Sequence, residues 1–365
     1  MRRLIPALVI GLIFGVLATP DGVSLSYSDI YTQWHAAGTL LDEGRMMARC
    51  ITPTTPQDVY YVSLIGKCGD PMTAWPPLYT LAIASVRAVT TDEGQALALL
   101  RAYHVMTWGG VAVVVYALLR RATTHRRAVL VTVLMLSNPP VVSVAQLAAS
   151  EPQFFLLSLA FLYLLVTYKP NTRHVLLLGC AAMLACMQRY TGVLCVGMGA
   201  VYLGYRREYR RSLLFSLLAF APLLYWCLRN VLFVGQPFGY RPPSPHTQDA
   251  LLSATIASIL QVLPYMLTVF LAGAAFARRV ASCNVFPHVL FAVLYGIGMF
   301  VSANAGEFTL LNVRLYSPAF IPLMFGSFHA GAWLIQRMLH IRPTAVASDK
   351  LALANTTQLE AVPVQ

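Results

Sequence analysis

The chain has 365 residues, of which 58% are hydrophobic and only 11% are charged. An average soluble domain carries about 25% charged residues, so too few polar side chains remain to coat a water-soluble surface of this size. The formal net charge is +12. The basic residues lie in short clusters between apolar runs and form no patch with interleaved aromatic residues, which argues against a nucleic-acid partner. Composition therefore indicates an integral membrane protein surrounded by membrane lipids.

The apolar residues come in runs of roughly 15 to 25, the length that crosses a bilayer core about 30 Å thick. We therefore predict an all-α fold, a polytopic transmembrane helical bundle of about ten spans. The predicted spans lie at about 4–19, 97–119, 128–148, 152–168, 174–188, 190–205, 212–233, 257–277, 286–303 and 315–336. The first twenty residues could instead be a signal peptide, but they lack a clear A-x-A cleavage site, so a retained span is preferred.

Basic residues cluster in alternate connectors, which the positive-inside rule assigns to the cytoplasm. These clusters lie at residues 2–3, 120–127, 169–173, 206–211, 278–279 and 337–342. The pattern predicts a multi-pass protein of the cell membrane with both termini in the cytoplasm. One transmembrane domain would occupy residues 1–342, with residues 20–95 as its first extracytoplasmic loop. Residues 343–365 are polar and aperiodic, and we expect a disordered cytoplasmic tail.

Two helices are predicted inside the first outer loop. Residues 28–45 carry apolar side chains at helical spacing, which predicts an amphipathic helix along the outer interface. Asp29 stands at its start, where it could serve simply as a helix N-cap. The apolar run Leu78 to Val89 is too short to cross the membrane comfortably, and counting it as a span would move the basic cluster at 120–127 outside. It is therefore read as an interfacial or re-entrant helix.

Cys50 and Cys68 share one polar segment of the first outer loop. An oxidising compartment would permit a disulfide between them, and the sequence leaves open whether they are bonded.

Different short motifs follow one another along residues 25–322. They are Asp29 with Trp34, Ala37, Leu41 and Gly44; Trp75-Pro76-Pro77-Leu78-Tyr79; Ser150-Glu151-Pro152; Gln188-Arg189-Tyr190-Thr191-Gly192; Leu228-Arg229-Asn230; Gly235-Gln236-Pro237-Phe238-Gly239; Arg241-Pro242-Pro243-Ser244; and Arg314-Leu315-Tyr316-Ser317-Pro318. This order resembles the GT-C glycosyltransferases, which include protein O-mannosyltransferases and lipid A aminoarabinose transferases. The last motif departs from that family, because Leu315 and Tyr316 replace its usual Arg-Tyr pair. Many family members are also longer than this chain.

The resemblance implies an inverting glycosyltransferase that takes a sugar from a polyprenyl-phosphate donor. Asp29 would be the general base that deprotonates an acceptor hydroxyl. Arginine suits bidentate contact with the leaving phosphate, and four lie on the predicted outer side: Arg189, Arg229, Arg241 and Arg314. Glu151, Tyr190 and His35 are candidate substrate-binding residues. The acceptor could be a lipid, a glycan or a protein.

Arg189 is the most informative of the four arginines. It interrupts an otherwise apolar stretch, and an ion at that depth is costly enough to suggest function. The alternatives are that its side chain extends to the surface or forms a structural ion pair with Glu151. Glu151 could equally owe its position to a span start, where negative charge suits the helix N-terminus.

The sequence indicates no cofactor. It has no metal-ligand spacing of His, Cys and Asp residues and no phosphate-cradling Gly-rich loop, although Asp29 could bind a divalent metal. The rival functions are a transporter or lipid flippase and a catalytically silent assembly subunit. Transporters usually carry charges near the bilayer midplane and internal repeats, which this sequence lacks.

Overall fold

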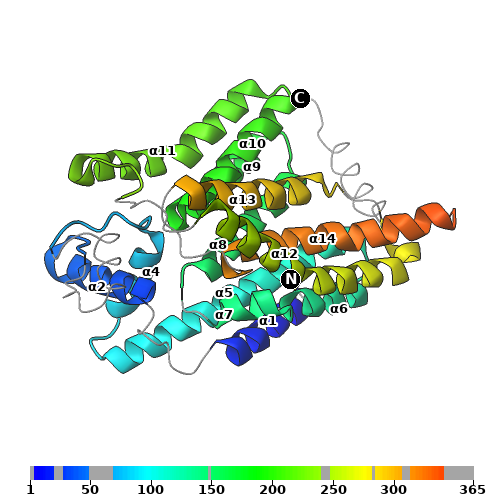
Figure 1. The fold of residues 1–365 in the computed structure, drawn as a ribbon, viewed down its shortest axis with the longest axis horizontal. Coiled ribbons are helices and arrows are strands. Elements are labelled where there is room, and N and C mark those ends of the chain that lie inside the picture. The colour runs from blue at the N-terminus through cyan, green and yellow to red at the C-terminus, as the bar shows by residue number, and fades with distance from the viewer. Residues whose placement is uncertain are drawn as a thin grey trace, which may run out of the picture.

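The computed structural model describes residues 4–19, 28–48, 69–146, 149–239, 247–281, 284–305 and 313–340. In these ranges the regular secondary structure is helical, and one isolated β-bridge joins Met47 and Pro71. The helices are α1 (Ile5–Ala18), α2 (Ser28–Glu43), α4 (Leu78–Arg87), α5 (Glu93–Ala122), α6 (His125–Leu136), α7 (Pro139–Ala145), α8 (Glu151–Val166), α9 (Thr172–Gln188), η1 (Tyr190–Gly192), α10 (Val193–Tyr205), α11 (Tyr209–Val234), α12 (Gln248–Ala275), η2 (Ala277–Arg279), α13 (Phe286–Ala305) and α14 (Val313–Met338). The α2–α4 pair lies at one end of the bundle, and the C-terminal ends of α12 and α14 lie at the other (Figure 1).

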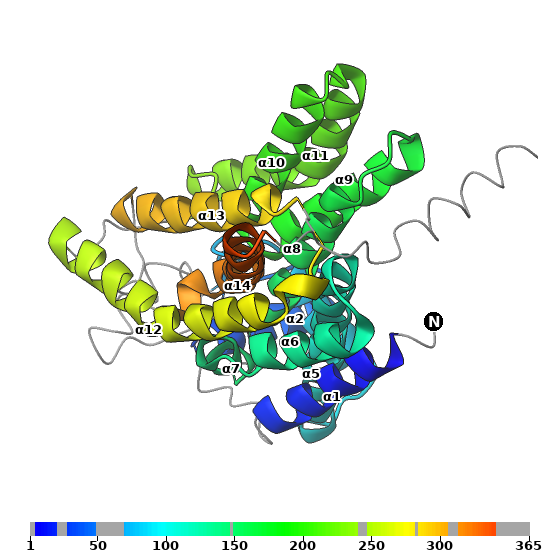
Figure 2. The same cartoon turned by 90° about the vertical axis from the view of Figure 1, so that its right-hand side faces the viewer.

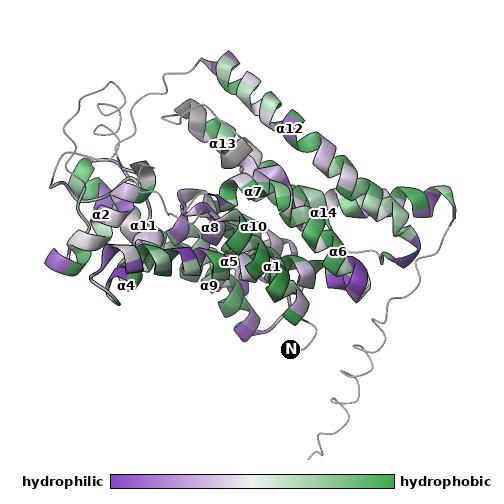
Figure 3. Ribbon diagram, turned by 90° about the horizontal axis from the view of Figure 1, so that it is seen from below, coloured by the Kyte–Doolittle hydropathy of each residue, from purple (hydrophilic) through white to green (hydrophobic). Residues whose placement is uncertain are grey.

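Each predicted span contains helix, which confirms the predicted all-α transmembrane bundle. Four of the described helices are long and apolar enough to cross a membrane: α5, α11, α12 and α14. A fifth crossing is possible through the bent pair α6–α7, and other apolar helices have 10–17 residues. The total of ten crossings stays a prediction. Hydrophobic colour fills much of the bundle, whereas hydrophilic stretches lie mainly at helix ends and on α2 (Figure 3).

The predicted span 128–148 is not one continuous helix but a bent pair of helices, and whether the pair crosses the membrane stays a prediction. α6 ends at Leu136, α7 begins at Pro139, and the two axes meet at 69°. Pro139 and Pro140 explain the break, because proline has no N–H donor and its ring clashes with a preceding helical turn.

The predicted first outer loop packs onto the bundle through a small hydrophobic cluster of its own. Ile30, Trp34 and Ala37 of α2 pack against Tyr79 and Ile83 of α4. The cluster continues to α5 and to Ala149, immediately before α8. The two predicted loop helices are thereby confirmed as helices and are fixed to α5 and to the segment that precedes α8. Their depth in the membrane stays a prediction.

Glycines allow α12 and α14 to cross in backbone contact. A Cβ at Gly273 would lie 1.9 Å from the carbonyl oxygen of Phe328, and a Cβ at Gly331 would lie 2.0 Å from that of Phe270. Small residues at helix crossings permit this close approach in membranes, where packing replaces the hydrophobic effect as the driving force.

We predict that Gly331→Ala destabilises the protein by about 1–3 kcal/mol, since neither backbone can move without disturbing the crossing. The measurement is the thermal unfolding midpoint of the full chain in detergent. Gly296→Ala in α13 is the matched control, because a Cβ there meets no atom within 4 Å. Equal midpoints for the two variants would contradict the crossing.

Candidate active site

An ion pair joins the start of α8 to the end of α9. Nη1 of Arg189 lies 3.0 Å from Oε1 of Glu151 and donates to Oγ of Ser150 at 3.2 Å. The side chains are 19% and 3% exposed, respectively. The predicted alternative of an Arg189–Glu151 ion pair is therefore the observed arrangement. Removing one partner of a buried pair is costly, because the other charge stays buried without compensation.

Local backbone geometry places Arg189 at this position. α9 ends at Gln188, and Arg189 is extended, with φ −148° and ψ 142°, before the 3₁₀ turn η1. The turn folds back on α9 so closely that a Cβ at Gly192 would lie 2.3 Å from the carbonyl carbon of Ala185. Glycine at position 192 therefore allows the helix to break after Gln188. The break places Arg189 just beyond the end of α9 and not inside a continuous helix.

A buried row of polar side chains runs from the loop helix α4 to the ion pair. The hydroxyl of Tyr79 lies 3.0 Å from Nε2 of His104, and Nδ1 of His104 lies 3.3 Å from the side-chain amide of Gln153. Gln188 donates to the carbonyl oxygen of Ser150 at 3.0 Å. Burial, assisted by the Glu151 carboxylate, raises the pKa of Tyr79 well above its usual value. Its hydroxyl therefore stays protonated.

Sequence reasoning did not select His104 or Gln153. Both are buried. The available signal was weak: each is a single polar residue at the edge of an apolar run, and such a residue is compatible with many roles. What identifies them is their contact with each other across α5 and α8, which the sequence does not specify.

A second hydrogen-bonded cluster connects three of the motifs. Tyr190 donates to the carbonyl oxygen of Thr73 at 2.8 Å, and its hydroxyl accepts from Trp226 at 3.2 Å and Asn230 at 3.1 Å. Asn230 also donates to the carbonyl oxygens of Thr73 at 3.3 Å and Pro237 at 3.0 Å. Three motifs that lie far apart in the sequence thus contact one another and the segment before α4, which belongs to the predicted first outer loop.

Arg229 belongs to the same cluster. Its guanidinium donates to the carbonyl oxygen of Met72 at 3.1 Å and lies 4.3 Å from the Trp226 ring centroid and 5.1 Å from that of Phe233. In this arrangement Arg229 holds the loop. Gly239 lies against the same segment with φ +76°, and a Cβ there would approach Thr73 to 2.9 Å.

α2 carries Asp29 in its first turn, one residue after its start at Ser28. The side chain of Asp29 lies outside the described part of the structure, as does that of Arg314, whose backbone is in α14. Arg241, Cys50 and Cys68 lie outside the described residues altogether.

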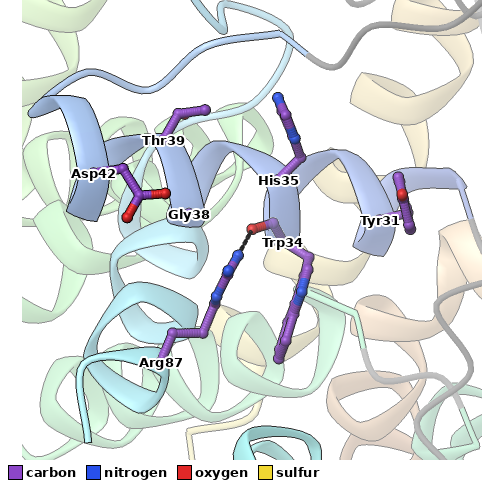
Figure 4. A pocket seen from close by; sticks show the side chains of 7 residues that line it. All are labelled: Tyr31, Trp34, His35, Gly38, Thr39, Asp42 and Arg87. Carbon is purple, nitrogen blue, oxygen red and sulfur yellow. Dashed lines mark hydrogen bonds between the residues drawn. The ribbon is translucent and has the colours of Figure 1, made fainter. Parts of the chain in front are cut away.

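His35 lines an open pocket of about 200 Å³ on α2 (Figure 4). The other lining residues are Tyr31, Trp34, Gly38, Thr39, Asp42 and Arg87. Arg87 forms one wall: its Nη1 donates to the carbonyl oxygen of Trp34 at 2.6 Å, and its guanidinium lies 4.9 Å from the Trp34 ring centroid. Close packing of Arg87 against Gly38 leaves no room for a larger side chain there, since a Cβ would approach Nη1 to 2.6 Å.

Within the described ranges, no group of three His, Cys, Asp or Glu residues could hold a metal ion. The possibility that Asp29 binds a metal is untested by this observation.

No family model and no curated protein matches the chain. Among solved structures, the crystal structure of ArnT from Cupriavidus metallidurans bound to undecaprenyl phosphate matches with a TM-score of 0.57. The chain shares the fold of ArnT. The likeness covers 90% of this chain and 59% of that one, at 14% sequence identity. It confirms the GT-C resemblance at the level of fold.

We predict that Tyr190→Phe lowers the free energy of unfolding by about 1–3 kcal/mol, because the Trp226 and Asn230 donors lose an acceptor. Thermal unfolding in detergent measures the effect. Tyr205→Phe is the matched control, since Tyr205 is 88% exposed at the end of α10. An equally small change in both variants would show that the Tyr190 cluster does not hold the loop.

Proposed function

We propose that the protein is an inverting glycosyltransferase that moves a sugar from a polyprenyl-phosphate donor to an acceptor hydroxyl on the extracytoplasmic face of the membrane. The observation that carries the proposal is the meeting of the GT-C motifs around Arg189 within the fold of ArnT, a protein whose crystal structure contains undecaprenyl phosphate.

The proposed reaction is a single displacement. The carboxylate of Asp29 takes the proton of the acceptor hydroxyl, and the oxygen attacks the anomeric carbon of the sugar. The bond from that carbon to the phosphate oxygen breaks, and polyprenyl phosphate leaves with the electron pair. Attack opposite to the leaving group inverts the anomeric centre.

Arg189 is the proposed ligand of the departing phosphate. Its contacts with Glu151 and Ser150 both use Nη1. A guanidinium has five N–H donors in a fixed fork, so binding Glu151 with one nitrogen is compatible with offering others to a phosphate. Glu151 would hold the guanidinium in one orientation before the donor arrives, and this preorganisation is what stabilises a developing charge. We propose Arg241 and Arg314 as further phosphate ligands, and Arg229 as a ligand that also anchors the loop.

Packing connects the proposed base to the proposed phosphate ligand. The helix that carries Asp29 is fixed to α4 by the Ile30, Ala37 and Ile83 contacts. α4 is fixed in turn by Tyr79, whose hydroxyl reaches His104. The same row of polar groups ends at Ser150, which contacts Arg189. The proposed base and the proposed phosphate ligand would thus be held by one continuous framework.

The pocket on α2 is the proposed site of the acceptor. His35, Thr39 and Asp42 offer donors and acceptors suited to hydroxyl groups, and Tyr31 and Trp34 offer aromatic surface. A polar headgroup, a glycan or a hydroxylated side chain would each satisfy this chemistry. Residue Tyr190 supports substrate binding indirectly, by holding the segment before α4.

The main alternatives are a transporter or flippase and a silent assembly subunit. The Arg189–Glu151 ion pair lies where α8 begins and α9 ends, and not at the centre of a long helix. This position favours chemistry at one face of the membrane over transport through it. An assay of transfer separates the enzyme from both alternatives, because only the enzyme releases polyprenyl phosphate.

We predict that Asp29→Asn lowers the rate of transfer by about 10²–10⁴-fold, the usual contribution of a general base. The assay incubates the purified protein with a panel of polyprenyl-phosphate sugars and measures released polyprenyl phosphate. Glu43→Gln, an exposed carboxylate at the other end of the same helix, is the charge-matched control and should keep full activity. An unaltered rate for Asp29→Asn would remove Asp29 as the base.

We predict that Arg189→Lys lowers kcat by about 10²–10³-fold, as expected when a preorganised donor to the developing charge is lost. Lysine keeps the positive charge beside Glu151, so the thermal unfolding midpoint should change little. Arg210→Lys is the control for replacing an arginine by lysine, because Arg210 is exposed and lies outside the site. Full turnover by Arg189→Lys would assign Arg189 to a purely structural ion pair.

A further inference from the structure

The end of the bundle opposite the α2–α4 pair carries a basic pocket that the proposed reaction does not use. It has a volume of about 300 Å³ and lies between the start of α6, the end of α12 and the end of α14. These elements lie together when the molecule is viewed from that end (Figure 2). The lining residues are Arg127, Ala274, Ala275, Phe276, Ala277, Arg278, Arg279, Ile335 and Leu339.

We propose that this pocket binds the headgroup of an anionic membrane phospholipid. Three arginines line it, and among the described residues that line it none is acidic. Arginine matches the geometry of a phosphate, to which it can donate two parallel hydrogen bonds.

The pocket differs in its charge pattern from the basic connector at residues 206–211. In the connector before α11, Glu208 lies 2.7 Å from Arg211 and 3.6 Å from Arg206, so those arginines have a counter-charge in the chain. Arg127 and Arg279 have no carboxylate among the described residues that line the pocket with them. A ligand with negative charge would supply it.

The apolar surroundings favour a lipid over a free anion. Leu339 lines the pocket and is 61% exposed, and Leu271, one turn before the pocket on α12, is 57% exposed. A phospholipid presents a charged headgroup followed by acyl chains, and this surface presents arginines followed by exposed leucines. The positive-inside prediction assigns this end of the bundle to the cytoplasmic leaflet, whose anionic lipids attract basic residues at the membrane surface.

The pocket walls are held in place before any lipid binds. Gln336 of α14 donates to the carbonyl oxygens of Ala277 at 2.6 Å and Val280 at 2.8 Å. Ala281 donates to the carbonyl oxygen of Ala122 at the end of α5. The guanidinium of Arg127 lies 5.3 Å from the ring centroid of Phe276. Such fixed walls reduce the entropy that binding must overcome.

The test titrates the purified full chain in detergent with dioleoylphosphatidylglycerol and follows the thermal unfolding midpoint. Parallel titrations use dioleoylphosphatidylcholine, which has the same chains without net charge, and inorganic phosphate. Arg127→Gln with Arg279→Gln removes two pocket charges, and Arg279→Gln alone serves if the double variant is unstable. Arg207→Gln with Arg210→Gln removes two exposed charges of the same predicted face, outside the pocket.

We expect a saturable rise in the midpoint with phosphatidylglycerol, and an apparent affinity that falls roughly fivefold for each pocket arginine removed. The variant outside the pocket should keep the affinity of the unmodified chain. The proposal is overturned if phosphatidylcholine stabilises as well, if inorganic phosphate alone gives the full rise, or if both double variants lose affinity equally.

Discussion

The buried pair of Arg189 and Glu151 is the interaction on which the candidate active site depends. Each charge alone would be expensive at the meeting point of α8 and α9, and each is held by the other at 3.0 Å. The pair also fixes the start of α8 relative to the end of α9. Ser150, Gln188 and the row of polar groups beyond them are arranged around that junction. A glycosyl-transfer site built here would therefore begin with its cation already oriented.

The sequence predicted much of the fold because the apolar runs and basic connectors follow simple physical rules. The loop helices at 28–43 and 78–87 were found from helical spacing and from a run too short to cross a bilayer. The bend between α6 and α7 was missed, although Pro139 and Pro140 were visible, because total hydropathy does not register where a helix changes direction.

The site was predicted less completely than the fold. Arg189 and Glu151 could be selected because a charge beside apolar residues is conspicuous, whereas their pairing needed the fold. His104 and Gln153 could not be selected, since a single polar residue has no distinctive pattern. For Arg229 the phosphate-binding role stays a prediction, and the structure adds contacts that the sequence did not predict: its guanidinium binds a loop carbonyl and lies against two aromatic rings.

The predicted first outer loop is attached to the bundle through its own main-chain carbonyl oxygens. Tyr190 and Asn230 bind the carbonyl of Thr73, and Arg229 binds that of Met72, so the side chains at these two loop positions are not what is recognised. Backbone carbonyls are the same whatever the residue. Substitutions in the loop would therefore leave these anchoring hydrogen bonds intact. Under the proposed function, the surface that meets the acceptor could change in evolution while the attachment of the loop stayed the same.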